Sequence, residues 1–115
     1  MPSPHSNAQR ELIRIFDTAF FDTGLANLRL SQYKEAVTAF DKCLKVNASY
    51  APAFYHKGFA LSRLKKFKEA VVAFDAAIKL DGGNYEVWNG KGSALAETRQ
   101  YEKAADAFEK PQSLC

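Results

Sequence analysis

A period of 34 residues runs along this chain of 115 residues, and an internal repeat restricts the possible folds more than any other sequence feature. The segment AVTAFD at 36–41 returns as AVVAFD at 70–75 and, more diverged, as AADAFE at 104–109. Aligning 17–50 with 51–84 without a gap gives 14 identical positions of 34. Because one such unit cannot bury its apolar face alone, the period predicts a stack of similar units that share a continuous core.

Apolar residues recur at helical spacing in both halves of a unit. In the second unit Phe54, Gly58 and Leu61 lie three or four positions apart, and the same spacing continues from Phe67 to Ile78. This pattern predicts two amphipathic helices joined by a short turn. The small side chain of Gly58 falls where the two helices should cross, and it permits the ~8–10 Å separation of closely packed helix axes.

These residues resemble the tetratricopeptide repeat, a helix–turn–helix unit of the same length with aromatic, Gly and Ala positions at these spacings. The segment FYHKGFAL at 54–61, with Lys before Gly, is similar to the prokaryotic form of that repeat, and the resemblance extends from Asp17 to about Lys110. It implies an all-α fold, an α-solenoid of three antiparallel helix–turn–helix repeats. The implied division of the chain is an N-terminal tail and helical extension at 1–16, then repeats at 17–50, 51–84 and 85–115, the last truncated and uncapped.

The two ends depart from the repeat. Residues 8–16 are spaced helically without a strong breaker, so we expect the first helix to extend backwards to a cap near Ser6 or Asn7. The alternative is a separate short helix after a frayed tail. Pro111 stands where the family has Ala, and we therefore expect the last helix to end near Lys110.

Charge and composition argue against several classes of function. The 16 basic and 13 acidic residues are mixed along the chain, whereas a nucleic-acid binder usually carries a one-sided basic stripe. No apolar run approaches the ~20 residues that span a membrane, and we expect no membrane partner. The two cysteines are far apart and form no disulfide framework, so we expect a reduced, cytoplasmic protein.

We expect no enzyme activity, cofactor or metal. His5 and His56 are too isolated for a catalytic pair or a metal site, and His56 is expected to lie at the surface. Cys43 occupies the position of a small core residue. The equivalent Asp41 and Asp75 are expected to be solvated, and Gly82-Gly83 is expected to form a turn, since no Gly-Lys-Ser follows it.

The resemblance also implies a binding surface, because the first helices of this family line a concave groove. The groove residues carried over to this sequence are Phe21, Leu25, Arg29, Tyr55, Phe59, Arg63 and Asn89. The groove would be aromatic and apolar near its N-terminal end and polar and acidic at the other. Core packing is the alternative role for Leu25.

The sequence thus predicts a protein-interaction module that holds a peptide or helix of a partner in this groove. The alternative is a self-association element, most simply a homodimer. Nucleic-acid binding through Lys34, Lys42 and Lys65–Lys68 is weaker, since acidic residues interrupt that patch. Some family members hold acidic chaperone tails with a clamp of Lys, Asn, Asn, Lys and Arg. We expect no such partner here, because the matching residues are Phe21, Leu25, His56, Glu86 and Gly90.

Overall fold

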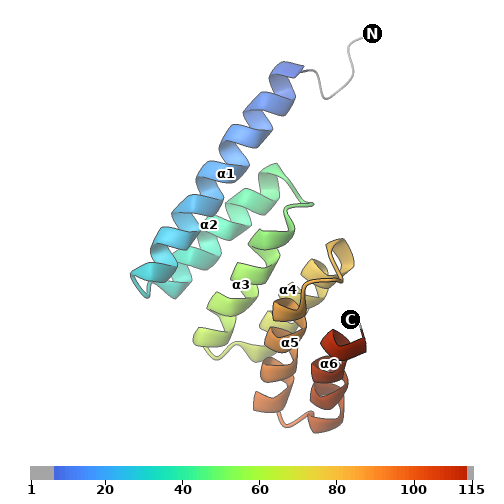
Figure 1. The fold of residues 1–115 in the computed structure, drawn as a ribbon. Helices are drawn as coiled ribbons and strands as arrows, with labels where there is room; N and C mark the ends of the chain where they lie inside the picture. Colours follow the sequence, from blue (N-terminus) through green and yellow to red (C-terminus); the bar gives the residue numbers. More distant parts are fainter. Residues whose placement is uncertain (1–6, 114–115) are drawn as a thin grey trace.

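The computed structural model describes residues 7–113, which form six α-helices and, within that range, no β-strand. The helices are α1 (Asn7–Arg29), α2 (Tyr33–Val46), α3 (Ala51–Arg63), α4 (Phe67–Leu80), α5 (Tyr85–Glu97) and α6 (Tyr101–Ser113). Each helix packs against the next in the chain, and the three helix pairs follow one another in a row (Figure 1). The predicted all-α solenoid is therefore confirmed.

The turn inside each helix pair has the same backbone geometry. In the second pair the Lys65 N–H donates to Ser62 O at 3.0 Å, and the Lys66 N–H donates to Leu61 O at 2.9 Å. These two bonds form a Schellman motif, which ends a helix with one residue in the left-handed region. That residue is Ser31, Lys65 or Arg99, with φ of 59°, 63° and 64°. A side chain in this region costs roughly 1 kcal/mol, so each turn depends on the packing of the helices beside it.

Each pair packs around one phenylalanine of its second helix. A Cβ added to Gly58 on α3 would lie 2.7 Å from the ring of Phe74 on α4, so only a glycine fits at this crossing. The next helix closes the other side of the ring, because a Cβ on Gly90 of α5 would lie 2.8 Å from Phe74. In the first pair His56 of α3 takes this second position and stacks on Phe40, with ring centroids 5.9 Å apart.

Successive pairs are also joined by one repeated ion pair. Lys57 Nζ on α3 lies 2.7 Å from Asp41 Oδ1 on α2, and Lys91 Nζ on α5 lies 2.7 Å from Asp75 Oδ1 on α4. Both aspartates are about half exposed, which agrees with the expectation that they are equivalent solvated positions. Each such pair contributes at most about 1 kcal/mol.

The first helices occupy the inner side of the stack. Helix α3 contacts both α1 and α5, whereas α2, α4 and α6 do not approach one another. Because the first helices are closer to one another than the second helices are, the row of pairs curves. Its concave side is the side of α1, α3 and α5. The solenoid therefore presents an inner face made of first helices and an outer face made of second helices.

The ends of the helical body meet one expectation and contradict another. Helix α1 begins at Asn7 and runs unbroken to Arg29, which confirms the backward extension; Ser6 lies outside the described residues. The prediction that the last helix ends near Lys110 is wrong, since α6 continues through Pro111 to Ser113. A proline lacks one N–H donor but has a helical φ, and in the final turn this single lost bond does not stop the helix.

A buried carboxylate holds the extended first helix to the loop after α2. Asp17 is the one charged residue among those described that is buried. Asn47 Nδ2 donates to its Oδ2 at 2.9 Å, and the Thr18 hydroxyl donates to its Oδ1 at 3.1 Å. Hydrogen bonds to both oxygens offset much of the cost of removing the charge from water.

Candidate functional site

The best-formed part of the inner face is a stack of side chains at the end of α3. The Arg63 guanidinium lies 5.7 Å from the ring centroid of Phe59 and 5.8 Å from that of Tyr33. Phe59 is 41% exposed, whereas the phenylalanines of the first two second helices, Phe40 and Phe74, are buried. An accessible aromatic ring beside a fixed guanidinium can hold both an apolar side chain and a carboxylate.

A hollow of about 450 Å³ lies next to this stack. It is lined by Tyr33, Ser62, Arg63, Lys65, Phe67, Ser93, Ala94 and Glu97, which belong to α2, α3, α4, α5 and the turn after α3. A hydrogen bond with Ser31 and then one with Arg63 lower the pKa of the Tyr33 hydroxyl. The lining of the hollow thus includes two basic residues, Arg63 and Lys65, and one acidic residue, Glu97.

Leu25 and Arg29 lie in a second hollow, on α1. Together with Asp22, Ala26 and Leu30 they line a space of about 470 Å³. The two residues are one helical turn apart, as Phe59 and Arg63 are on α3. An apolar residue followed by an arginine one turn later therefore occurs at the same place in the first two pairs.

The three remaining predicted groove residues are placed differently. Phe21 is half-buried among rings, with centroid distances of 5.7 Å to Phe40 and 5.1 Å to Tyr50. Tyr55 packs on Phe74 at 6.1 Å and also lines a smaller hollow of about 220 Å³ between α3 and α5. Asn89 is exposed on α5 and lines neither this hollow nor the two larger ones described above.

His56 is half-buried among aromatic rings and also lines the smaller hollow, so the expectation of a surface residue holds only in part. Its ring packs against Phe21 at 5.4 Å, Phe40 at 5.9 Å and Tyr55 at 4.9 Å. Burial lowers the pKa of the imidazole, and the carboxylate of Glu86 opposes that shift. Helix α3 lies between α1 and α5 and is therefore covered on two sides. The sequence pattern had predicted one buried face of this helix.

Tyr33 is the main residue of this site that the sequence analysis missed. It begins a second helix, and only first helices were expected to line the groove. The sequence of one pair holds no signal for this contact, because the helix before Tyr33 ends at Arg29, whereas Arg63 ends α3 of the next pair.

The described residues contain no group of three or more His, Cys, Asp or Glu side chains that could hold a metal ion. Cys43 is fully buried, and burial, followed by the nearby charge of Asp17, raises the pKa of its thiol to about 11. A thiol in that state is a poor nucleophile and acts as a core residue. No described helix is both long enough and apolar enough to cross a membrane.

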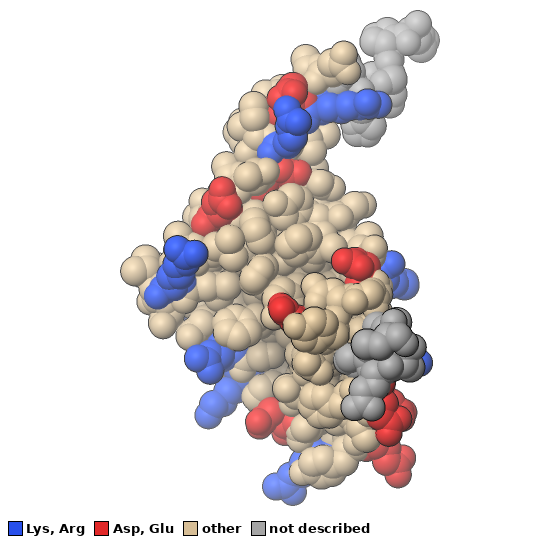
Figure 2. Space-filling model, viewed as in Figure 1, with Lys and Arg blue, Asp and Glu red and all other residues tan. Residues whose placement is uncertain are grey.

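The surface view agrees with this distribution of side chains. Figure 2, drawn from the same side as Figure 1, shows a broad area without charged groups over the middle of the molecule. Lys and Arg side chains lie around the edges of this area in Figure 2. Arg29 and Arg63 are the last residues of α1 and α3. An uncharged area bordered by charged side chains is compatible with a protein-binding face.

Comparisons with known proteins give a consistent result. Two family models, both described as tetratricopeptide repeat, match residues 55–112 and 18–50. A search of curated protein sequences finds no match.

Several solved structures share the fold. The second TPR of Spaghetti (RPAP3), solved with the HSP90 peptide SRMEEVD, is 20% identical with a TM-score of 0.87, over 95% of this chain and 99% of that one. The Arabidopsis OM64 TPR domain is 23% identical with a TM-score of 0.82, over 85% and 81%. MamA is 21% identical with a TM-score of 0.83, over 85% of this chain, which spans only 57% of the MamA chain.

Proposed function

The chain belongs to the tetratricopeptide repeat family, and on that premise we propose that it is a non-catalytic interaction module that binds a peptide or helix of a partner protein on its inner face. Its proposed compartment is the cytoplasm, as the two widely separated cysteines indicate. The inner face offers exposed apolar side chains next to fixed charges.

The stack of Arg63 between Phe59 and Tyr33 is the observation that carries this proposal. It costs free energy to leave a phenylalanine exposed, so an accessible ring that does not serve the core is best explained by a partner. The proposed ligand places an apolar side chain on Phe59 and an acidic group on Arg63. A basic group of the ligand would then lie near Glu97.

Selection of short random peptides on the immobilised chain tests the proposal. Enriched peptides are synthesised and their affinities measured by calorimetry. We expect Phe59→Ser to weaken binding about tenfold or more, as loss of a central aromatic contact does. Val72→Ser, which removes an exposed apolar side chain from α4, is the matched control and should leave the affinity unchanged. Failure to enrich any peptide, or equal losses in both variants, would contradict the proposal.

We propose further that free acidic chaperone tails are not the ligand of this face. Phe21 and His56 stand at two of the clamp positions, and they pack on each other instead of offering donors. Glu86 at a third position would repel a carboxylate. Titration with the peptide SRMEEVD should give no micromolar binding; binding that is lost on amidation of its C-terminus would overturn this statement.

Self-association is a second candidate function. The exposed aromatic side chains of the last helix pair support it. Tyr101 and Phe108 are 64% and 41% exposed, whereas Phe74, at the position equivalent to Phe108, is buried. Burial of such rings against a second copy would be favourable at ~25 cal/mol per Å². Light scattering over a hundredfold concentration range should then show a rising mass, and a constant monomer mass would reject this candidate.

A further inference from the structure

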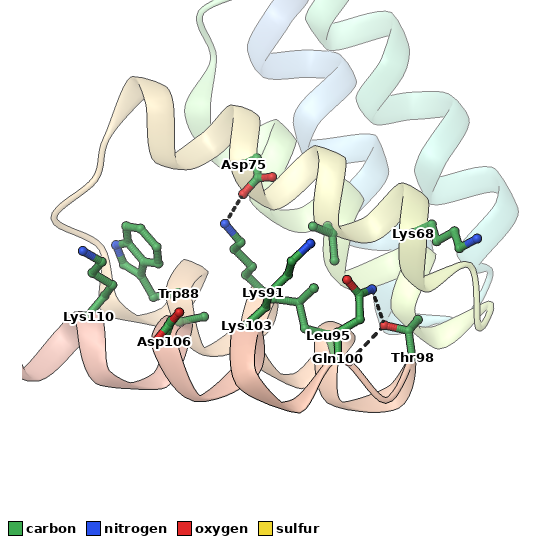
Figure 3. A pocket seen from close by; sticks show the side chains of 12 residues that line it. Lys68, Asp75, Trp88, Lys91, Leu95, Thr98, Gln100, Lys103, Asp106 and Lys110 are labelled. Atoms are coloured by element: carbon green, nitrogen blue, oxygen red, sulfur yellow. Dashed lines mark hydrogen bonds and ion pairs between the residues drawn. The ribbon is translucent and has the colours of Figure 1, made fainter.

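A separate hollow lies on the outer side of the solenoid, between α4 and α6. The backbones of these two helices stay apart, and both helices pack on α5, which forms the floor (Figure 3). The space has a volume of about 480 Å³. Its α5 residues are Trp88, Lys91 and Leu95, which at 3.6 residues per turn lie on the face opposite Asn89 and Ser93. The hollow is therefore distinct from the inner face.

The floor of this outer hollow is apolar and rigid. Val71, Trp88, Leu95 and Ala107 contribute to it, and Leu95 and Ala107 belong to the buried core. The Trp88 indole is fixed because its Nε1–H donates to Gly82 O at 2.8 Å. Since that donor is already engaged, the indole offers the hollow an apolar ring surface.

The rim of the hollow is basic. It has four lysines, Lys68, Lys91, Lys103 and Lys110, against the two acids Asp75 and Asp106. Lys91 Nζ pairs with Asp75 at 2.7 Å and lies 5.5 Å from the ring centroid of Trp88, so it holds charge directly over the apolar floor. In Figure 3 the side chains of Lys91 and Lys103 both reach towards α4. An occupant should therefore combine an apolar group with negative charge.

The fold does not require this basic rim. The equivalent residues between α2 and α4, which lie 34 positions earlier, show this. A shift by 34 residues places Glu69 at the position of Lys103 and Ala76 at that of Lys110, while Lys34 stays equivalent to Lys68. The equivalent residues between α2 and α4 thus have three lysines, Lys34, Lys57 and Lys66, against the two acids Asp41 and Glu69. The basic excess is therefore two charges in the α4–α6 hollow and one charge at the equivalent residues between α2 and α4.

We propose that the outer hollow is a second binding site, which takes a short acidic segment of a partner polypeptide with one large apolar side chain. The apolar side chain would rest on Trp88 and Leu95, and its acidic neighbours would face Lys68 and Lys103. The rim runs for seven residues along each of α4 and α6, or ~10 Å, which matches about three residues of extended chain. Nucleic acid is a poorer fit, because Asp75 and Asp106 would lie beside its phosphates.

Trp88 makes this site directly observable, because it is the only tryptophan of the chain. The probe is a capped peptide, N-acetylated and C-amidated, with one leucine flanked on each side by two glutamates. We expect a saturable change in Trp88 fluorescence that weakens as salt screens the charges, and backbone amide shifts confined to α4, α5 and α6. No saturation, or amide shifts centred on α1 and the end of α3, would overturn the proposal.

A matched pair of variants separates the hollow from general charge attraction. Lys103→Glu reverses one rim charge and should weaken the peptide about tenfold. Lys34→Glu makes the same change at an exposed position outside the hollow, and its affinity should stay within about twofold of the parent chain. Equal weakening by both variants would overturn the proposal, and so would displacement of the peptide by a short poly-thymidine strand. Phe59→Ser should not change this affinity, so failure here is distinguishable from failure of the inner-face proposal.

Discussion

The central and last helix pairs contain the same phenylalanine in different surroundings. Phe74 lies between Gly58 of its own pair and Gly90 of the next, and it is 2% exposed. Among the described residues Gly92 is the one glycine that lies against Phe108, which is 41% exposed. The local sequence around the two rings is alike, so the difference arises from the neighbouring helix. Stability in this solenoid is therefore a property of the contact between pairs as much as of each pair.

The largest expected effect is the difference between two truncations. Phe74→Ala should destabilise the protein by about 3–5 kcal/mol, because a fully enclosed ring leaves a cavity. Phe108→Ala should cost about half as much, since water already reaches part of that ring. Urea unfolding with equal m-values measures both, and equal losses would show that the last pair is covered in solution.

Overpacking tests the same contact from the glycine side. Gly58→Leu should cost about 1–3 kcal/mol, because even its Cβ would meet the Phe74 ring at 2.7 Å. Gly83→Leu in the exposed loop before α5 is the control and should change the free energy of unfolding by less than about 0.5 kcal/mol. An unchanged melting temperature for Gly58→Leu would contradict the assigned register of α3 on α4.

The effect of a substitution in the turn should be the same in the central and the last helix pair, unlike the effect of truncating the phenylalanine. Lys65→Gly should stabilise the protein by about 0.5 kcal/mol, because relief of the left-handed backbone exceeds the entropy that glycine adds to the unfolded chain. Arg99→Gly, with nearly the same φ, should give the same gain. Lys66→Gly, where φ is −91°, should only destabilise. A gain in one turn and not the other, by thermal or urea unfolding, would show that turn strain also depends on the neighbouring pair.

The smallest expected effect concerns His56. It packs on Phe40 at the repeat position where Gly90 packs on Phe74. Burial lowers its pKa in the folded protein, so the unfolded chain takes up the proton first as the pH falls. Stability should therefore be complete above the unfolded pKa of about 6.5 and decline below it. His56→Phe should remove this part of the pH dependence in urea titrations at a series of pH values; an unchanged slope would contradict it.

The sequence was sufficient for the parts of the fold that depend on contacts within one pair. The 34-residue period located the helices, and the Gly58 position predicted a close crossing. The burial of His56 could not be read in this way, because Phe21 and Phe40 reach it from two other helices. A pattern along one helix predicts its main buried stripe and misses a second one made by the neighbouring pair.

The candidate site divides in the same manner. Leu25 with Arg29 and Phe59 with Arg63 follow from repeat positions, and each couple occurs within one helix. Tyr33 joins Arg63 only because the first turn lies beside the end of α3. The outer hollow was also missed, although the change from Glu69 to Lys103 at equivalent positions was visible in the sequence.

The left-handed residues Ser31, Lys65 and Arg99 have a consequence for how the chain folds. A turn that is unfavourable by itself cannot act as a nucleus, and an isolated helix pair would have to form against it. Folding should then begin where two pairs meet and spread to both sides, with a transition state that already contains contacts between α3, α4 and α5. Terminal helices would join last and separate first, so the molecule behaves as a short cooperative chain whose least stable links are its ends.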